Sequence, residues 1–144
     1  KGSLLNEKNI LANTEVISNH HKLNDKTKTL VLMPMFHNNG LINSFLSTLM
    51  SGGVTVIAPA NFIIYNFWRI VQKFRIKYVS LMPSVLSMIN NFSKYFKNKS
   101  LKLISCGGQK LSSNLIRKFE NKYSLKIIEN YGLTETTSIS TIQP

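Results

Sequence analysis

Five short apolar runs recur along the chain, separated by longer segments in which the apolar residues are spaced differently. Runs of about five consecutive apolar residues are typical of strands buried on both faces of a parallel sheet. Several of these runs end at proline or glycine, residues that do not continue a central strand. We therefore predict strands over residues 29–33, 54–58, 78–82, 103–105 and 125–128.

The segments between these runs carry apolar residues at helical spacing. In residues 61–74 a stripe that includes Phe67 and Phe74 predicts an amphipathic helix. Residues 41–50 are apolar nearly all round, which is typical of a buried helix. Further helices are expected over residues 6–19, from Pro83 to Ile89, and from Ser112 or Ser113 to Phe119.

This alternation of strands and helices predicts an α/β fold. We expect a largely parallel, right-handed wound sheet with helices on both faces. The length of 144 residues suits one domain, and a composition of 43% hydrophobic and 17% charged residues is sufficient for a core. Because there is no start methionine, we expect residues 1–144 to be a single partial domain of a longer protein.

The cysteine count and the hydropathy exclude disulfides within the chain, cysteine-based zinc sites and membrane spans. Cys106 is the one cysteine, so neither a disulfide within the chain nor a cysteine-based zinc site can form. A lone cysteine is compatible with a reducing compartment, and we expect a cytoplasmic location. No run approaches the roughly 18 uninterrupted apolar residues that a membrane span needs.

A formal net charge of +12 raises the question of a nucleic-acid partner. The lysines are spread along the chain, and arginine, which reads phosphates and base edges better, occurs only at Arg69, Arg75 and Arg117. We therefore consider nucleic-acid binding a minor alternative. Acidic membrane surfaces or anionic ligands would be attracted by the same charge.

The stretch from Glu129 to Thr137 follows the last predicted strand and could hold a nucleotide and its metal ion. Tyr131 offers a flat face for a base, and Gly132 lets backbone approach a ligand closely. Thr134 can hydrogen-bond a phosphate, and Glu135 can hold Mg²⁺. The simpler alternative is a strand followed by a polar turn.

Two other loops should lie at the same edge of the sheet, because the carboxyl ends of parallel strands meet there. The loop 36–40 contains His37, which could be a base, a gate, a ligand or a histidine hydrogen-bonded within its loop. The loop 105–109 contains Cys106, which is either a nucleophile or a packed thiol. In that loop Gly107-Gly108 is a tight turn, a flat floor for a planar ligand, or both.

The order PMFHNNG, SGG, SCGGQKL and ENYGLTETT resembles the central part of the adenylate-forming superfamily. This superfamily contains acyl- and aryl-CoA ligases, luciferases and peptide-synthetase adenylation domains. The resemblance covers essentially the whole chain, and YGLTET is its most specific string. His37 follows Phe36 where peptide-synthetase domains usually carry aspartate, so the chain is more similar to the CoA ligases.

The resemblance implies a reaction and its participants. The parent protein would use ATP and Mg²⁺ to adenylate a carboxylic acid, and then transfer the acyl group to CoA or to the phosphopantetheine thiol of a carrier protein. Thr134, Glu135 and His37 would be the catalytic residues: Thr134 would bind the α-phosphate, Glu135 the Mg²⁺, and His37 would gate the acyl pocket, which Phe36 helps to line. The nucleotide-binding residues would be Lys1, Ser105, Gly107, Gly108, Gln109, Glu129, Asn130, Tyr131, Gly132 and Thr134.

Several elements of that superfamily have no counterpart in residues 1–144. They are the body of the phosphate loop, the ribose-binding aspartate, the hinge, and the small C-terminal domain with its catalytic lysine. We therefore expect the chain to be inactive when isolated. The alternative is a non-catalytic nucleotide-binding or scaffolding remnant of the same fold. The acyl substrate and the oligomeric state are left open.

Overall fold

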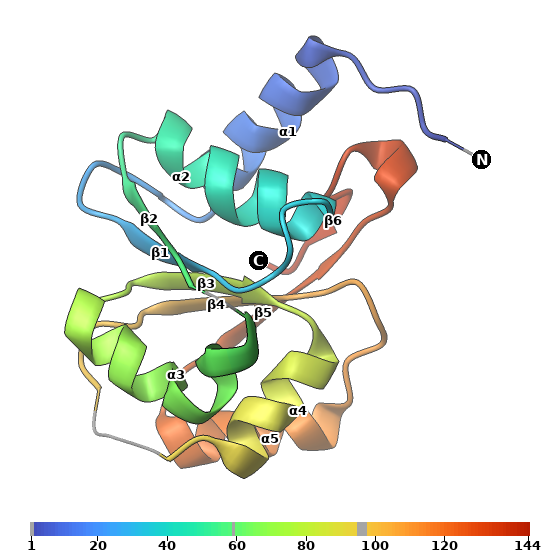
Figure 1. The fold of residues 1–144 in the computed structure, drawn as a ribbon. Helices are drawn as coiled ribbons and strands as arrows, with labels where there is room; N and C mark the ends of the chain where they lie inside the picture. The colour runs from blue at the N-terminus through green and yellow to red at the C-terminus, as the bar shows by residue number, and fades with distance from the viewer. Residues whose placement is uncertain (1, 59, 95–97) are drawn as a thin grey trace.

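A six-stranded sheet in the order β2-β1-β3-β4-β5-β6 forms the centre of the computed structural model (Figure 1), which describes residues 2–58, 60–94 and 98–144. Strands β1 to β5 are parallel, and β6 pairs antiparallel with β5. The strands are β1 (Lys28–Val31), β2 (Val54–Ile57), β3 (Tyr78–Leu81), β4 (Leu103–Cys106), β5 (Ile127–Tyr131) and β6 (Thr141–Ile142).

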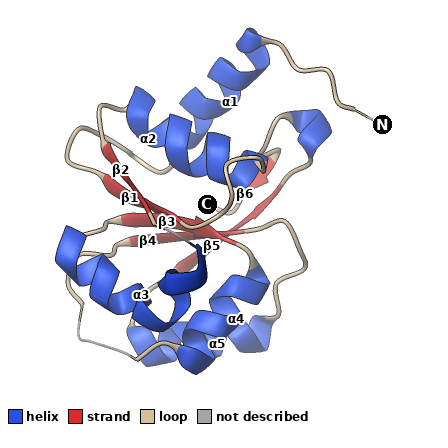
Figure 2. Cartoon of the chain, in the orientation of Figure 1, coloured by secondary structure: helices blue, strands red, loops and turns tan. Residues whose placement is uncertain are grey.

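Helices cover both faces of this sheet, which confirms the predicted α/β architecture (Figure 2). One layer contains α1 (Glu7–His20), η1 (Asn39–Leu46) and α2 (Ser47–Met50). The other contains α3 (Ala60–Phe74), α4 (Pro83–Phe92) and α5 (Ser113–Tyr123). A short 3₁₀ helix, η2 (Thr134–Thr136), follows β5. No helix of the described residues is long and apolar enough to cross a bilayer.

The layer of α3 to α5 packs on the sheet through an apolar core. The fully buried Trp68 lies with its ring centroid 4.9 Å from that of Phe67 and 4.6 Å from that of Tyr123. Aromatic rings in such edge-on and tilted arrangements stabilise a core beyond their area burial. This packing of α3, α4 and α5 holds the strands of the sheet in place.

The layer of η1 and α2 packs on the sheet through polar groups instead. The Tyr78 hydroxyl donates to Asn43 Oδ1 at 2.7 Å, and Asn43 Nδ2 donates to Ser80 Oγ at 2.7 Å. The hydroxyls of Thr29 and Thr48 share a hydrogen bond of 2.6 Å. All five residues are buried, so these polar groups are paired where water is excluded.

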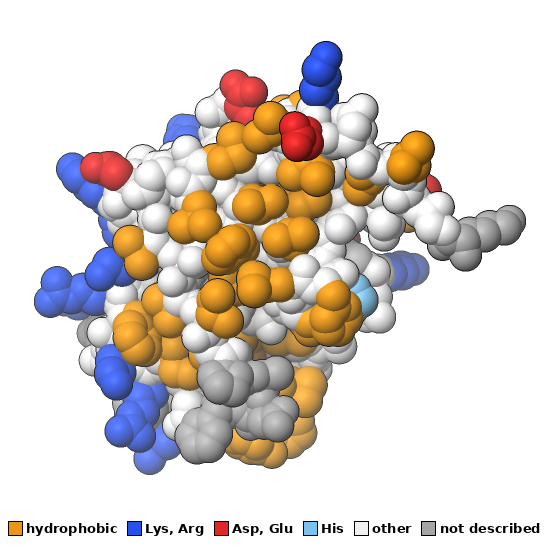
Figure 3. Space-filling model, turned by 45° about the horizontal axis from the view of Figure 1, so that its top comes forward, with side chains coloured by type: hydrophobic (Ala, Val, Ile, Leu, Met, Phe, Trp, Pro, Cys, Tyr) orange, Lys and Arg blue, Asp and Glu red, His pale blue; other side chains and the backbone are white. Residues whose placement is uncertain are grey.

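The helix predicted over residues 41–50 is therefore present but differs from the prediction. Its hydrogen bonding is of π type from Asn39 to Leu46, and it begins two residues earlier than expected. Its polar side faces the sheet, while Leu49 and Met50 are exposed. Hydrophobic side chains are accordingly visible on this side of the molecule in Figure 3. The expected burial of this helix holds from residue 41 to residue 48 and fails at Leu49 and Met50. The burial of its polar side chains was not predicted, because their hydrogen-bond partners come from β3.

Three other details differ from the sequence-based predictions. The fifth strand runs from Ile127 to Tyr131, beyond the predicted end at Ile128, so Glu129 and Asn130 belong to the strand. Strand β6 was not predicted, because two residues carry no periodic signal. Ser112 occupies the N-cap position of α5, but its side chain makes no capping hydrogen bond.

Candidate nucleotide site at the carboxyl edge of the sheet

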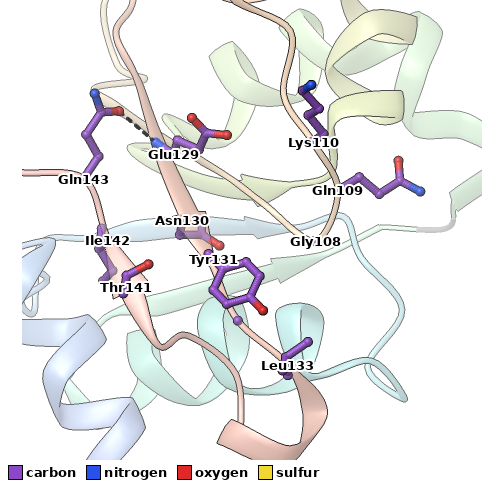
Figure 4. Close-up of a pocket in the computed structure, with 11 residues that line it drawn as sticks. Gly108, Gln109, Lys110, Glu129, Asn130, Tyr131, Leu133, Thr141, Ile142 and Gln143 are labelled. Carbon is purple, nitrogen blue, oxygen red and sulfur yellow. Dashed lines mark hydrogen bonds between the residues drawn. The ribbon is translucent and has the colours of Figure 1, made fainter.

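Two neighbouring cavities lie at the carboxyl ends of the parallel strands. The first, of about 760 Å³, lies between the segment after β4 and the edge formed by β5 and β6 (Figure 4). Its lining residues are Gly108, Gln109, Lys110, Glu129, Asn130, Tyr131, Gly132, Leu133, Thr141, Ile142 and Gln143. A crevice at this edge is where open α/β sheets bind ligands.

Tyr131 is the aromatic residue in this first cavity. It is the last residue of β5, its side chain is 59% exposed, and it lies below Glu129 in Figure 4, with Gly108 on the other side of the cavity. The Gln143 side chain closes the β6 side, where its Oε1 accepts a hydrogen bond of 3.4 Å from the Glu129 backbone N–H. An open aromatic face opposite a glycine leaves space for a planar ring system.

The turn after β4 is held tightly against β5. Asn130 Nδ2 donates a 2.6 Å hydrogen bond to Ser105 Oγ, and both residues are buried. A Cβ atom at Gly107 would overlap the Asn130 side chain and lie 2.5 Å from its carbonyl oxygen, so this position requires glycine. Ser105 and Gly107 therefore position Asn130 and the turn, and neither lines the two cavities.

The second cavity, of about 340 Å³, brings the three predicted loops together. His37 comes from the loop after β1, Gly108 from the turn after β4, and Thr134 and Glu135 from η2. The other lining residues are Met33, Asn38, Asn39, Asn43, Met82, Asn130, Gly132, Leu133, Ser138 and Ile139. The expectation that these loops share one edge is confirmed.

Thr134 and Glu135 start a single 3₁₀ turn and are both exposed. The turn is fixed by the Leu133 N–H, which donates to Thr136 Oγ1 at 3.0 Å. A Cβ atom at Gly132 would overlap the Ser138 carbonyl group, so the close backbone approach expected at Gly132 is made by the chain itself. The free hydroxyl and carboxylate thus stand on a rigid turn.

His37 lies exposed in its loop, with its ring centroid 4.6 Å from that of the exposed Phe36. The following residues are anchored below: Ser80 Oγ donates to Asn39 Oδ1 at 2.8 Å. Asn38 lines the second cavity, and its Nδ2 atom is buried and, among the described residues, has no hydrogen-bond partner. This amide is an unpaired, buried donor beside His37.

The chain of hydrogen bonds from Tyr78 through Asn43 and Ser80 to Asn39 holds this loop. Burial raises the pKa of the Tyr78 hydroxyl well above its ordinary range, although hydrogen bonds to Ser80 and Ser105 oppose the shift. Tyr78 therefore stays protonated and remains a donor. The network links the start of the π-helical segment to β3 and fixes where the His37 loop ends.

We expect Tyr78→Phe to lower the free energy of unfolding by about 1–2 kcal/mol, because Asn43 Oδ1 loses its donor in a buried position. Urea denaturation followed by the fluorescence of the buried Trp68 measures this change. Tyr65→Phe is the matched control, since Tyr65 is 68% exposed. Equal stability of both variants would show that the Tyr78 hydroxyl contributes nothing.

The alternative of Cys106 as a nucleophile is not supported. The thiol is fully buried in the core, and this burial, together with the Glu129 carboxylate, raises its pKa to about 12. A thiol of that pKa is protonated at neutral pH and unreactive. Cys106 is a packed core residue.

Glu135 does not form a metal site of protein ligands alone. In the described residues no group of three or more His, Cys, Asp or Glu side chains could hold a metal ion. Mg²⁺ is, however, commonly held by one or two carboxylates together with the phosphates of a substrate. The lone exposed carboxylate of Glu135 fits a metal ion that is bound together with a nucleotide.

Some site residues were not found from the sequence, and one cannot be placed. Lys1, predicted to contact the nucleotide, lies outside the described residues. Lys110 and Gln143 line the first cavity and Met82 the second. Met82 could have been found, because it follows β3 at the same edge as the three recognised loops. The unpredicted strand β6 brings Gln143 to the site.

The comparisons with known proteins agree with this geometry. Residues 1–144 match the family described as AMP-binding enzyme. The chain is 32% identical over 145 residues to the probable CoA ligase CCL5 of Humulus lupulus, covering 96% of this chain and 26% of that protein. It superposes on ATP-bound MatB from Rhodopseudomonas palustris with a TM-score of 0.90 and 20% identity, covering 100% of this chain and 28% of that one.

A further solved structure with the same fold is the O-succinylbenzoate coenzyme A synthetase of Bacillus subtilis, in complex with ATP and magnesium ion. The TM-score is 0.84 at 19% identity, covering 99% of this chain and 29% of that one. The present chain thus spans about a quarter of the length of the curated relative and of these structures. Since the family match covers every residue, the chain belongs to the family of AMP-binding enzymes.

Proposed function

We propose that the protein containing this chain activates a carboxylic acid with ATP, giving an acyl-adenylate and pyrophosphate. The acyl group then passes to the thiol of CoA or of a carrier phosphopantetheine. The observation that carries the proposal is the second cavity, where Thr134, Glu135 and His37 meet. The relative from Humulus lupulus, described as a probable CoA ligase, supports the class of reaction.

The nucleotide base occupies the first cavity in this proposal. Tyr131 stacks on one face of the base, and the backbone at Gly108 lies against the other. Gln109, Glu129 and Asn130 line the same cavity and supply hydrogen-bonding groups around the ring edge. Ser105 and Gly107 act indirectly, by fixing Asn130 and the turn.

The phosphates extend from there into the second cavity, because Gly108, Asn130, Gly132 and Leu133 line both. The substrate carboxylate attacks the α-phosphorus, and the bond to the oxygen of the leaving pyrophosphate breaks. The Thr134 hydroxyl donates to an α-phosphate oxygen, and Glu135 would hold a Mg²⁺ ion, which would neutralise phosphate charge. Such reactions depend mainly on alignment and charge neutralisation.

His37 and Asn38 stand at the acyl side of this cavity. The exposed His37 ring and the neighbouring Phe36 ring form a movable boundary that admits or excludes the acyl group. The end of this loop is held in place through Asn39 and the network below it, so the movement is confined to the exposed Phe36 and His37 side chains.

Charge neutralisation in these cavities is incomplete. Among the described residues that line the second cavity there is no lysine or arginine, and the first contains Lys110 alone. A triphosphate needs more positive charge than one lysine and one metal ion provide. The isolated chain should therefore bind nucleotide without converting it.

We expect the full-length protein to release pyrophosphate when it is given MgATP and a panel of carboxylic acids, and the purified 144-residue chain to release none above a blank without enzyme. A coupled pyrophosphate assay measures both. Turnover by the isolated chain would contradict the proposal that residues 1–144 lack part of the positive charge that the reaction needs. Nucleotide binding without turnover by the full-length protein would instead identify a non-catalytic remnant.

We also propose a cytoplasmic location. The supporting observation is that the one cysteine is a buried free thiol in the core, as expected of a protein that folds in a reducing compartment.

A further inference from the structure

The amino-terminal edge of the sheet, opposite to the candidate site, carries one lysine at each of four strands. Lys28 is the first residue of β1, and Lys77, Lys102 and Lys126 immediately precede β3, β4 and β5. All four are exposed, although each is flanked by at least one buried or half-buried residue. We call these four residues the lysine row.

Three members of the lysine row, Lys28, Lys77 and Lys102, lie side by side at the starts of adjacent strands. The Lys77 N–H donates to the Lys28 carbonyl at 2.7 Å, and the Lys102 N–H donates to the Lys77 carbonyl at 2.9 Å. Strands β1, β3, β4 and β5 are consecutive in the sheet. Lys126 completes the row one position further along, because the β4–β5 register pairs Ile104 with Ile127 and so places Lys126 beside Leu103. With neighbouring strands about 4.8 Å apart, the row extends over roughly 15 Å.

Other cations surround the lysine row. The loops and helix ends at this edge contribute Lys22, Lys26, Lys73, Arg75, Lys94, Lys99 and Lys122. The described carboxylates that accompany them are Asp25 and Glu120, and Glu120 already accepts a hydrogen bond from the Ile127 N–H. Figure 3 shows Lys and Arg side chains gathered along the left side of the view.

Two simpler explanations do not account for the lysine row. Lysine near a helix C-terminus complements the helix dipole, which explains Lys73 and Lys122, but the row belongs to strands. A general abundance of lysine in the chain would place lysines at both edges of the sheet. The described loops at the opposite edge, residues 34–38, 107–112 and 132–140, contain only Lys110. The charge is thus placed at one edge.

Exposed apolar side chains continue this edge at β2. Val54 pairs with Lys28 in the β1–β2 register and is 49% exposed. Leu49 and Met50, at the end of the preceding helix α2, are 43% and 52% exposed. The edge therefore combines a row of cations with an apolar flank.

We propose that this edge docks on the surface of an anionic lipid bilayer. Lysine ammonium groups are compact, strongly hydrated point charges that suit mobile lipid headgroups, whereas base and phosphate recognition favours arginine. Leu49, Met50 and Val54 can enter the headgroup region, whereas the phosphate backbone of a nucleic acid offers them no apolar surface. The candidate nucleotide site then faces away from the membrane. This inference does not depend on the proposed enzymatic function.

The test uses the 144-residue chain and vesicles of phosphatidylcholine, with or without about one-third phosphatidylserine. We expect binding to the anionic vesicles only, weakening as salt is raised. Replacing the whole lysine row (K28Q, K77Q, K102Q and K126Q) should lower the partition coefficient by about 100-fold, because each lysine near an anionic surface strengthens binding several-fold.

The matched control removes four exposed cations elsewhere, with K8Q, R69Q, R117Q and K118Q, and therefore has the same net charge. It should bind anionic vesicles within about threefold of the unmodified chain, since its edge is intact. A third variant, M50S with V54T, should bind about tenfold more weakly, because two apolar side chains no longer enter the headgroups. Thermal unfolding of each variant verifies that it is folded.

Three results would overturn the proposal. Equal losses in the lysine-row variant and the control would show that net charge alone determines binding. Tighter binding to RNA or DNA oligonucleotides than to anionic vesicles at the same salt concentration would favour a nucleic acid. No binding of the folded chain to anionic vesicles would exclude a membrane surface.

Discussion

Replacing Glu135 by glutamine in the full-length protein is expected to lower Mg²⁺-dependent pyrophosphate release by about 100-fold or more, with almost no change in melting temperature. Glu135 is exposed on the first turn of η2, so its carboxylate contributes little to packing. The substitution keeps the size of the side chain and removes the charge that would hold the metal ion. Activity should therefore fall far more than stability.

Kinetics at varied Mg²⁺ concentration separate this role from a structural one. The variant should need more Mg²⁺ for half-maximal rate, and Glu15→Gln should behave like the unmodified protein, because Glu15 is exposed on α1 and lines none of the cavities described. If Glu135→Gln adenylates normally at low Mg²⁺, the metal role is wrong. A parallel loss of activity and melting temperature would indicate that Glu135 supports the turn instead.

The sheet could be predicted from the sequence because its strands are apolar on consecutive positions. Runs such as residues 78–82 need burial on both faces, and this requirement determines the layered α/β fold. The edge at which the loops meet followed from the parallel topology. His37, Gly108 and Thr134 therefore lie in one cavity, as expected, although their distances in sequence are large.

The polar packing of η1 could not be predicted in the same way. Sequence patterns assign the apolar side of a helix to the core, but here Asn43 points inward because Tyr78 and Ser80 on β3 offer hydrogen-bond partners. Pairing of this kind depends on which residues meet across two elements. The short strand β6 was missed for a related reason, since its two residues are recognisable only by their pairing with Asn130 and Tyr131.

The distribution of charge over the surface is another feature that could not be predicted from the sequence. The lysines were interpreted from the sequence as spread along the chain, which is true of their order and wrong for their arrangement in space. Parallel βα units bring every strand start to one edge, so Lys28, Lys77, Lys102 and Lys126 become neighbours although they are separated by up to about 100 positions. The topology, and not the composition, concentrates the charge.

A buried histidine at the end of α1 gives the folded chain a specific sensitivity to acid. His21 is 8% exposed, packs with its ring centroid 5.2 Å from that of Tyr78, and has no hydrogen-bond partner for either ring nitrogen among the described residues. Burial, and to a smaller extent the neighbouring His20, lower its pKa from 6.5 to about 4. The folded chain therefore contains neutral His21 at pH 7.

Between pH 6.5 and about 4 the unfolded chain binds a proton at His21 that the folded chain does not, so the free energy of unfolding should fall as the pH decreases through this window. The total loss from this group is about 3 kcal/mol. Urea denaturation monitored by Trp68 fluorescence at about pH 7.5, 5.5 and 4 measures this loss of unfolding free energy. His21→Phe should remove this part of the pH dependence, and His20→Gln should keep most of it. Identical pH profiles for the unmodified chain and His21→Phe would mean that folding does not lower the pKa of His21.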